Sequence, residues 1–344
     1  MLGYIPARYQ VYCEENPAFS ISRVARQEKG LYRILDTAGL QPAQVSGKFQ
    51  YIAKSASDYP AVGDYVMVDR NDGGMAVIHT VLPRTSVFLR KAAGNINSEQ
   101  VIATNIDTIF LCMALNNDFN LRRLERYLSA AWDGGATPVV LLTKADLCDD
   151  IHERIAQVEN IAVGVEVITV SALEENVCRI LATYLVEGKT LAFVGSSGVG
   201  KSTLINHLLG EDRMATNGLR RDDKGRHTTT HRELIVLPCG ATVIDTPGMR
   251  ELGMWDAGEG LSAAFADIET LAGRCRFTDC THRTEPGCAV RAALERGELS
   301  EERLHSYEKL RKENAWSEDA ENYLRVKEEK FEKIAMINKT SCRK

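Results

Sequence analysis

The chain has 344 residues, of which 44% are hydrophobic and 26% charged, and its formal net charge is −5. This length accommodates about two or three domains of an ordinary globular protein. The acidic balance excludes a globally basic nucleic-acid binder, so any such partner would be met by local patches. The longest apolar run is too short to span a bilayer and the start lacks a secretory pattern. Nine cysteines, most of them isolated, indicate reduced thiols. We therefore expect a cytoplasmic protein with no membrane partner.

The first third of the sequence has the pattern of a small β domain. Residues 1–28 are weakly patterned, and we predict that they form an N-terminal arm. From Leu31 to about Lys91, short β-type runs alternate with Gly and Asp turns. Strands at this spacing predict a small barrel or sandwich, which we place at residues 29–94. On this pattern alone, a spacer domain with no binding role remains an alternative.

From Ile106 the pattern changes to alternating strands and helices. Residues 106–115 contain a continuous apolar run, residues 109–115, which is typical of a buried parallel strand. Residues 121–135 place apolar side chains on one helical stripe, and further strands are expected at residues 138–142, 165–170 and 190–194. This predicts an α/β domain with a mostly parallel sheet at residues 95–253. Strand signals end after Leu252, and residues 254–344 are expected to be helical.

A glycine-rich motif between one predicted strand and one predicted helix fits G-x-x-x-x-G-K-[ST]. Its backbone N–H groups would surround phosphate oxygens at a helix N-terminus. Lys201 would reach the β- and γ-phosphates, and the Ser202 hydroxyl would bind Mg²⁺. A purely structural glycine turn is the alternative. The predicted phosphate site comprises Gly195, Ser196, Ser197, Gly198, Val199, Gly200, Lys201, Ser202 and Thr203.

Two later segments complete the pattern of a phosphate site. Asp245 lies at the end of a predicted strand, where we expect it to be a Mg²⁺ partner. Gly248 follows in D-x-x-G spacing, and its N–H could sense a γ-phosphate. Between the phosphate loop and Asp245 lies a polar segment with three consecutive threonines, residues 228–230. A loop that closes a threonine hydroxyl onto Mg²⁺ is a switching device of nucleotide-regulated enzymes. A plain polar surface loop is the alternative.

The base-reading signal precedes the phosphate loop. It is the tetrapeptide Thr143, Lys144, Ala145, Asp146. The Asp146 carboxylate can accept from the N1–H and N2–H₂ groups of guanine, donors that adenine lacks at that edge. The usual first residue is Asn, and the Thr143 hydroxyl can replace its amide only in part. Ser171 and Ala172, after the strand at residues 165–170, are expected to support the base. In most guanine-nucleotide domains the phosphate loop comes first.

With these motifs in this order, the chain resembles the ribosome small subunit-dependent GTPase A family, whose GTPase domain is circularly permuted. The matching segments include "GSSGVGKSTLIN", "GRHTTT", "DTPGMRELG" and "FTDCTHRTEPGCAV". The resemblance implies a multidomain α/β protein with an N-terminal OB-type β-barrel, a permuted P-loop GTPase domain and a helical zinc-binding domain. It also implies subunit-stimulated GTP hydrolysis in late maturation of the small (30S) ribosomal subunit. The implied ligands are GTP or GDP and Mg²⁺, with Thr229 as a Mg²⁺ ligand, and the implied partner is 16S rRNA, bound by a monomer.

A cysteine and histidine cluster lies in the C-terminal part. Cys275, Cys280, His282 and Cys288 have the spacing C-x4-C-x-H-x5-C. Three thiolates and one imidazole form a closed tetrahedral set, which is typical of structural zinc. From this chemistry alone, a coincidental group of thiols remains possible. The resemblance favours one zinc ion per chain.

The catalytic group that orients water in Ras-like enzymes is missing. Those enzymes have Gln after D-x-x-G, whereas this chain has Met249 there and no Gln between Gly195 and Lys344. We expect slow intrinsic hydrolysis, with His227 as the candidate that holds the water. Thr229 and Lys201 complete the predicted catalytic set. The alternative for His227 is that it only caps or packs the loop.

Two other functions are compatible with parts of the sequence. A P-loop kinase for a small substrate would share the phosphate loop, although the "TKAD" segment and the threonines argue against it. A nucleotide-gated RNA-binding protein with negligible turnover would share all the motifs. Only measured turnover separates that second alternative from a GTPase.

Overall fold

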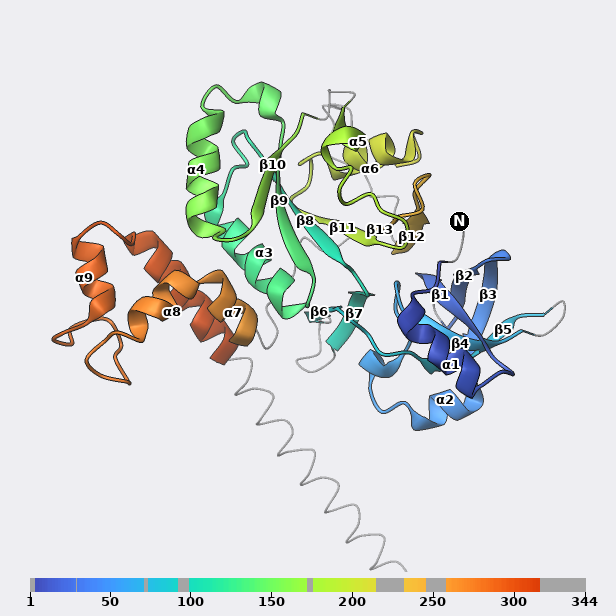
Figure 1. Ribbon diagram of the computed structural model, residues 1–344. Helices are drawn as coiled ribbons and strands as arrows, with labels where there is room; N and C mark the ends of the chain where they lie inside the picture. Colours follow the sequence, from blue (N-terminus) through green and yellow to red (C-terminus); the bar gives the residue numbers. More distant parts are fainter. Residues whose placement is uncertain are drawn as a thin grey trace, which may run out of the picture.

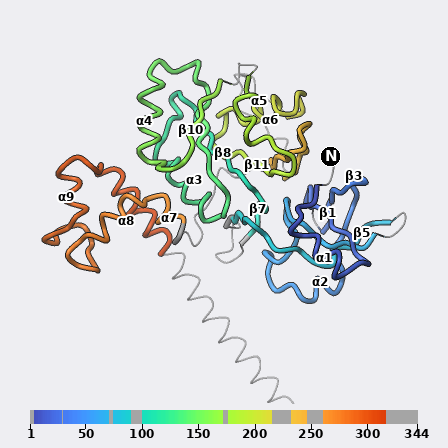
Figure 2. Tube along the Cα trace, viewed as in Figure 1, coloured from blue at the N-terminus to red at the C-terminus, as the bar shows by residue number. Residues whose placement is uncertain are grey.

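The computed structural model describes residues 4–28, 30–70, 74–91, 99–171, 176–214, 232–245 and 258–315. Figure 1 shows a β-barrel, a central α/β domain and a group of C-terminal helices, with the α/β domain between the other two. The Cα trace shows the same arrangement in chain order (Figure 2). Among the described residues, no helix is long and apolar enough to cross a membrane.

Five strands close the N-terminal barrel. They lie in the order β1-β2-β3-β5-β4, and β4 pairs back with β1. The interior is filled by buried apolar side chains from every strand, because alternate residues of a strand face one side of the sheet. The predicted OB-type barrel is confirmed. The strands are β1 (Ser20–Gln27), β2 (Tyr32–Asp36), β3 (Gly39–Val45), β4 (Tyr65–Asp69) and β5 (Ala76–Val81), with α2 (Gly47–Ile52) and η2 (Ala56–Asp58) between β3 and β4.

The N-terminal segment differs from the predicted arm of residues 1–28. β1 lies in this range and pairs with both β2 and β4, after η1 (Ala7–Tyr9) and α1 (Gln10–Glu15). Residues 21–25 are buried without interruption, since Val24 faces the barrel interior and Arg23 faces the central domain. A strand buried on both faces lacks the period-2 pattern, which is why the sequence did not indicate it.

The last strand predicted for the barrel also lies elsewhere. β6 (Val87–Lys91) pairs with β7 (Glu99–Thr104) in a separate two-stranded sheet. The N–H of Val87 donates to the carbonyl of Gly134 at 2.9 Å, and the Phe88 ring is buried. A Cβ at Gly134 would lie 2.5 Å from that ring, so this ribbon packs closely on the central domain.

The central domain has the predicted α/β architecture. Its strand order is β10-β9-β8-β11-β13-β12, with all neighbours parallel except β12 and β13. Alternate residues of β8 pack on opposite faces: Leu111 with α3 and α4, and Phe110 with α5 and α6. The elements are β8 (Thr108–Ala114), α3 (Leu121–Asp133), β9 (Thr137–Thr143), η3 (Ala145–Leu147), α4 (Ile151–Ile161), β10 (Glu166–Thr169), α5 (Val177–Ile180), β11 (Thr190–Val194), α6 (Lys201–Leu209), β12 (Glu233–Val236) and β13 (Thr242–Asp245).

The described part of the C-terminal domain, residues 258–315, is helical, as predicted, and packs on α3. Its helices are α7 (Gly258–Ala264), α8 (Ala266–Ala272), α9 (Ala289–Glu295) and a last helix at residues 301–315. A Cβ at Gly260 would lie 2.4 Å from the carbonyl oxygen of Ser129, so α7 approaches α3 closely. The buried Glu125 of α3 accepts hydrogen bonds from Arg303 at 3.0 Å and from Ser306 at 2.6 Å. An ionic contact therefore lies inside this interface.

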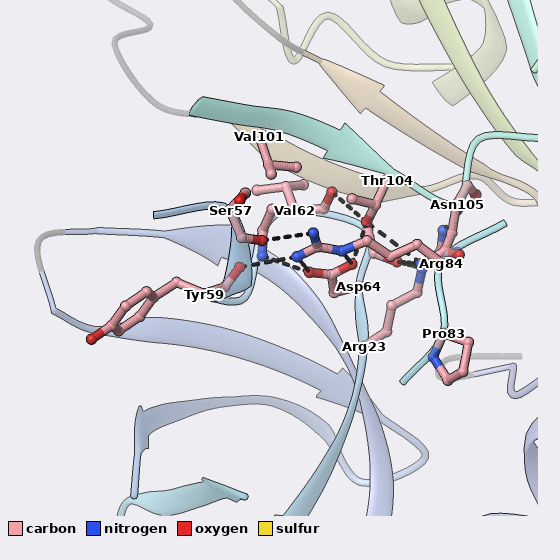
Figure 3. A network of polar contacts seen from close by, with 12 residues as sticks. Arg23, Ser57, Tyr59, Val62, Asp64, Pro83, Arg84, Val101, Thr104 and Asn105 are labelled. Carbon is pink, nitrogen blue, oxygen red and sulfur yellow. Dashed lines mark hydrogen bonds and ion pairs between the residues drawn. The ribbon is translucent and has the colours of Figure 1, made fainter. Parts of the chain in front are cut away.

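A polar network lies where the barrel meets the central domain, and Figure 3 shows the part of it around Asp64, Arg84 and Thr104. The buried Arg23 of β1 donates to Thr190 Oγ1 at 2.7 Å and to Thr242 Oγ1 at 3.1 Å. Close by, the buried carboxylate of Asp64 accepts from Arg84 at 2.7 and 2.8 Å and from Thr104 Oγ1 at 2.7 Å. The network thus reaches the first residues of β11 and β13, whose opposite ends carry the predicted phosphate-site residues.

Candidate functional site

The phosphate loop lies between β11 and α6, the strand and helix predicted around it. Gly198 and Gly200 adopt φ values of 75° and 108°, a left-handed region that only glycine enters without strain. A Cβ at Gly195 would lie 2.4 Å from the carbonyl oxygen of Cys112. The loop can therefore pack against β8, and its backbone N–H groups, together with those at the N-terminal end of α6, can point towards an anion. This backbone fits a nucleotide phosphate group.

Lys201 and Asp245 meet at this loop. The ammonium group of Lys201 donates to the carbonyl oxygens of Gly195 and Ser196, both at 2.7 Å. Burial raises the pKa of Asp245, whereas the nearby positive charge of Lys201 acts to lower it. Ser202 and Thr203 occupy the first turn of α6. A cation, a carboxylate and a helix N-terminus thus lie at adjacent strand ends, and this donor set fits phosphates with Mg²⁺.

The base loop is hydrogen-bonded to the phosphate loop. The buried hydroxyl of Thr143, at the end of β9, donates to the carbonyl oxygen of Val199 at 2.6 Å. Thr143 therefore connects two segments that are 56 residues apart in the sequence. Lys144 adopts a left-handed φ of 58°, which turns the chain sharply into Ala145 and Asp146. The hydroxyl is sufficient to make a link between the loops, even though Asn is the more usual residue.

Asp146 lies beside the end of β10. Its Oδ1 accepts a hydrogen bond from Ser171 Oγ at 2.7 Å, so the two predicted base-contacting segments meet. A carboxylate has a further oxygen and unused lone pairs, which leaves Asp146 acceptor capacity for a ligand. The structure therefore brings Thr143, Asp146, Ser171 and Val199 together at one edge of the sheet.

Several predicted site residues lie outside the described residues. They are Ala172, His227, Thr228, Thr229, Thr230, Gly248 and Met249. Their roles stay predictions from the sequence.

One group at this edge was missed by the sequence analysis. Asp118 follows β8 and accepts a hydrogen bond from the hydroxyl of Ser196, inside the phosphate loop. Arg123 in turn binds the Asp118 carboxylate at 2.9 and 3.0 Å. A signal was available, because a polar run follows β8, and carboxyl ends of parallel strands meet at one edge. The neighbour relation of β8 and β11 was not visible in the sequence.

The cysteine cluster is assembled in the C-terminal domain. The ligand atoms of Cys275, Cys280, His282 and Cys288 all lie within 4.8 Å of one another. The Sγ atoms of Cys275 and Cys288 are 3.9 Å apart, and they lie 3.6 and 3.5 Å from Nδ1 of His282. A tetrahedral ion with metal–sulfur bonds of about 2.3 Å would place its sulfur ligands about 3.8 Å apart. The four side chains therefore fit a structural zinc ion, and Nδ1 is the imidazole atom that faces it.

Comparison with known proteins gives the family. The sequence model of the RsgA GTPase family matches residues 81–255. The small ribosomal subunit biogenesis GTPase RsgA 2 of Lactiplantibacillus plantarum is 54% identical over 297 residues, which cover 86% of this chain and 84% of the relative. The small ribosomal subunit biogenesis GTPase RsgA 1 of Oceanobacillus iheyensis is 44% identical over 324 residues, which cover 93% of this chain and 92% of the relative.

Solved structures agree with this result. YjeQ from Thermotoga maritima superposes with a TM-score of 0.63 at 27% identity, over 85% of this chain and 97% of that one. YloQ, a circularly permuted GTPase, shares the fold with a TM-score of 0.60 at 24% identity, over 89% of this chain and 96% of its own. The resemblance in the motifs is confirmed, and the chain belongs to the RsgA GTPase family.

Proposed function

We propose that this RsgA-family GTPase binds GTP and GDP with Mg²⁺ at the carboxyl edge of its central sheet and hydrolyses GTP during biogenesis of the small ribosomal subunit. The observation that carries the proposal is the hydrogen bond from Thr143 to Val199, because it joins the base loop to the phosphate loop. The relatives' name, small ribosomal subunit biogenesis GTPase, supports the partner. In this proposal the chain acts as a cytoplasmic monomer with 16S rRNA as its RNA partner.

The residues divide the work between base and phosphates. Asp146 accepts from the guanine edge, and Ser171 orients that carboxylate. Lys201 exchanges its two loop carbonyls for phosphate oxygens when nucleotide binds. When bound, Mg²⁺ supplies charge neutralisation between the phosphates, and Ser202, Thr229 and Asp245 would hold it. Gly248 is proposed to contact the γ-phosphate, and His227 to orient the attacking water.

Guanine selectivity is tested by Asp146→Asn. An amide offers a donor where the carboxylate accepts, so affinity for GTP should fall by at least about 100-fold and preference should shift towards xanthosine triphosphate. Titration with both nucleotides and with ATP measures the change. Asp149→Asn, an exposed carboxylate three positions later, is the matched control and should bind as wild type does. Equal affinities of the wild type for ATP and GTP would refute the assignment.

The partner is tested by measuring hydrolysis with and without purified small ribosomal subunits. We expect stimulation of roughly tenfold or more, which His227→Ala should largely abolish while leaving GTP affinity near wild type. Large subunits serve as the control. Binding to the small subunit without turnover would favour a nucleotide-gated RNA-binding protein instead. Transfer of phosphate to a small molecule would favour a kinase.

The zinc assignment is tested by elemental analysis of unchelated protein, for which we expect one ion per chain. Replacement of Cys280 by Ser should remove the ion and unfold the surrounding loops, because binding of a structural metal contributes folding free energy. Cys239→Ser, at an exposed cysteine outside the cluster, is the control and should retain zinc. A wild-type chain without zinc would leave the cluster as a group of thiols.

A further inference from the structure

The side chain of Ser196 is held by a carboxylate from another segment. Ser196 is the second residue of the phosphate loop, and its hydroxyl donates to Oδ2 of Asp118. The two residues are 78 positions apart. They meet because β8 and β11 are parallel neighbours, with Leu111 opposite Val194, so the segments that follow them emerge side by side. The carbonyl of the same Ser196 also accepts from Lys201.

Asp118 is itself fixed in position. Arg123 binds its carboxylate with two prongs, Nη1 to Oδ1 at 3.0 Å and Nη2 to Oδ2 at 2.9 Å. The backbone N–H of Asp118 donates to Asn116 Oδ1 at 3.0 Å, and that of Arg123 donates to the N-cap Asn120 Oδ1 at 2.9 Å. A two-pronged pair between backbone-anchored residues has a defined geometry, which an isolated surface ion pair lacks. The contacts that run from Arg123 through Asp118 to Ser196 therefore have a defined geometry.

The negative charge of Asp118 lies beside the phosphate loop, where it affects the binding of phosphates. A carboxylate beside a loop that receives phosphates repels the ligand, and this repulsion is strong where water is partly excluded. The side chains of Asp118 and Arg123 are 37% and 28% exposed, so screening between the carboxylate and the loop is incomplete. The guanidinium of Arg123 cancels the negative charge while leaving Asp118 able to accept from Ser196.

We propose that Asp118 is a positioning residue for the nucleotide: it fixes Ser196, and with it the phosphate loop, before phosphates arrive, while Arg123 orients Asp118 and neutralises it. This inference rests on the proposed binding of GTP at the loop. A phosphate loop that is already ordered loses less conformational entropy when the nucleotide binds, so its affinity is higher. Since the loop contacts substrate and transition state alike, the effect falls on KM and on nucleotide affinity rather than on kcat.

The hydrogen bond is tested by a double-mutant cycle on the full-length protein. Asp118→Ala and Ser196→Ala should each weaken binding of a fluorescent GDP analogue and raise KM for GTP by about threefold to tenfold, with kcat within about twofold. The double variant should be no weaker than the weaker single variant, because both changes remove one interaction. Ser196→Thr, which keeps the hydroxyl, should recover most of the affinity. Glu159→Ala, an exposed carboxylate on α4, is the charge-matched control and should behave as wild type.

The charge is tested by Arg123→Ala. It should weaken nucleotide binding more than Asp118→Ala does, and GTP more than GDP, because GTP carries the greater charge. Adding Asp118→Ala to Arg123→Ala should restore affinity to the level of Asp118→Ala alone. Zinc content and thermal unfolding verify that every variant is folded.

Four outcomes would overturn the inference. In the cycle of Asp118→Ala and Ser196→Ala, the two losses of affinity could multiply as independent effects, or kcat could fall with KM unchanged. The variant with both Arg123→Ala and Asp118→Ala could bind nucleotide more weakly than Arg123→Ala does, or the single variants could bind it as the wild type does. A wild-type protein that binds no guanine nucleotide would instead refute the proposed function, so the two failures are distinguishable.

Discussion

Two buried arginines attach the outer domains to the central domain, and their partners differ in charge. Arg23 of the barrel donates only to neutral oxygens, two threonine hydroxyls and two backbone carbonyls. Arg303 of the C-terminal domain donates to the carboxylates of Asp267 at 2.7 Å and Glu125 at 3.0 Å. Burial lowers the pKa of Arg23. Burial also acts to lower the pKa of Arg303, but the two carboxylates leave it raised.

The difference shows what each interface depends on. The carboxylate of Glu125 is fully buried and needs cations beside it. Removing Arg303 should therefore lower the stability of the protein strongly. The oxygens around Arg23 have other partners: Gly63 O also accepts from Asn105 Nδ2 at 3.1 Å, and the hydroxyls of Thr190 and Thr242 lie 3.2 Å apart. The barrel interface should therefore tolerate loss of its arginine better than the C-terminal interface does.

The largest effect is expected for Arg303→Met. It leaves the buried Glu125 with Ser306 and the partly exposed Arg122, and should reduce the free energy of unfolding by about 3 kcal/mol or more. Denaturant unfolding measures the loss. Arg291→Met, whose exposed pair with Glu295 is 3.8 Å long, is the matched control and should cost less than about 1 kcal/mol.

The reason for the loss can be tested separately. Adding Glu125→Gln to Arg303→Met removes the buried charge that Arg122 alone would then have to neutralise, so part of the stability should return. A double variant less stable than Arg303→Met would show that the cost lies in lost packing and not in the buried carboxylate that has lost one of its two cations.

A smaller effect is expected for Arg23→Met. The substitution keeps an unbranched apolar stem against the Tyr65 ring, over which the guanidinium lies at 4.8 Å, and it strands no carboxylate in direct contact. We expect a loss of about 1–2 kcal/mol by the same measurement. Arg26→Met on the same strand, with a half-exposed side chain, is the control. A greater loss for Arg23→Met than for Arg303→Met would reverse the comparison.

The contrast also explains which parts could be predicted from the sequence. The phosphate loop and the zinc cluster were visible because their chemistry is contained in short runs, from Gly195 to Ser202 and from Cys275 to Cys288. β1 was not visible, because Arg23 is buried against residues far along the chain, and two of its acceptors, Thr190 and Thr242, lie 167 and 219 positions later. Asp118 was missed for the same reason, since its place depends on β8 lying beside β11. Local motifs predict ligands, whereas the supports of the site come from tertiary neighbours.

The smallest effect is expected for Thr190→Val, which removes one acceptor of Arg23. Valine has the shape of threonine and favours a strand, so β11 should keep its pairing with β8 and β13. Arg23 retains Thr242 and the carbonyls, and the loss should be about 1 kcal/mol or less. Residue 190 begins β11, and the phosphate loop follows its other end, so nucleotide affinity should stay at the wild-type value. Unfolding and titration with a fluorescent GDP analogue measure the two quantities on one variant. A change in nucleotide affinity of more than about threefold, roughly 0.65 kcal/mol, would mean that the contact between Arg23 of the barrel and Thr190 of β11 influences nucleotide binding.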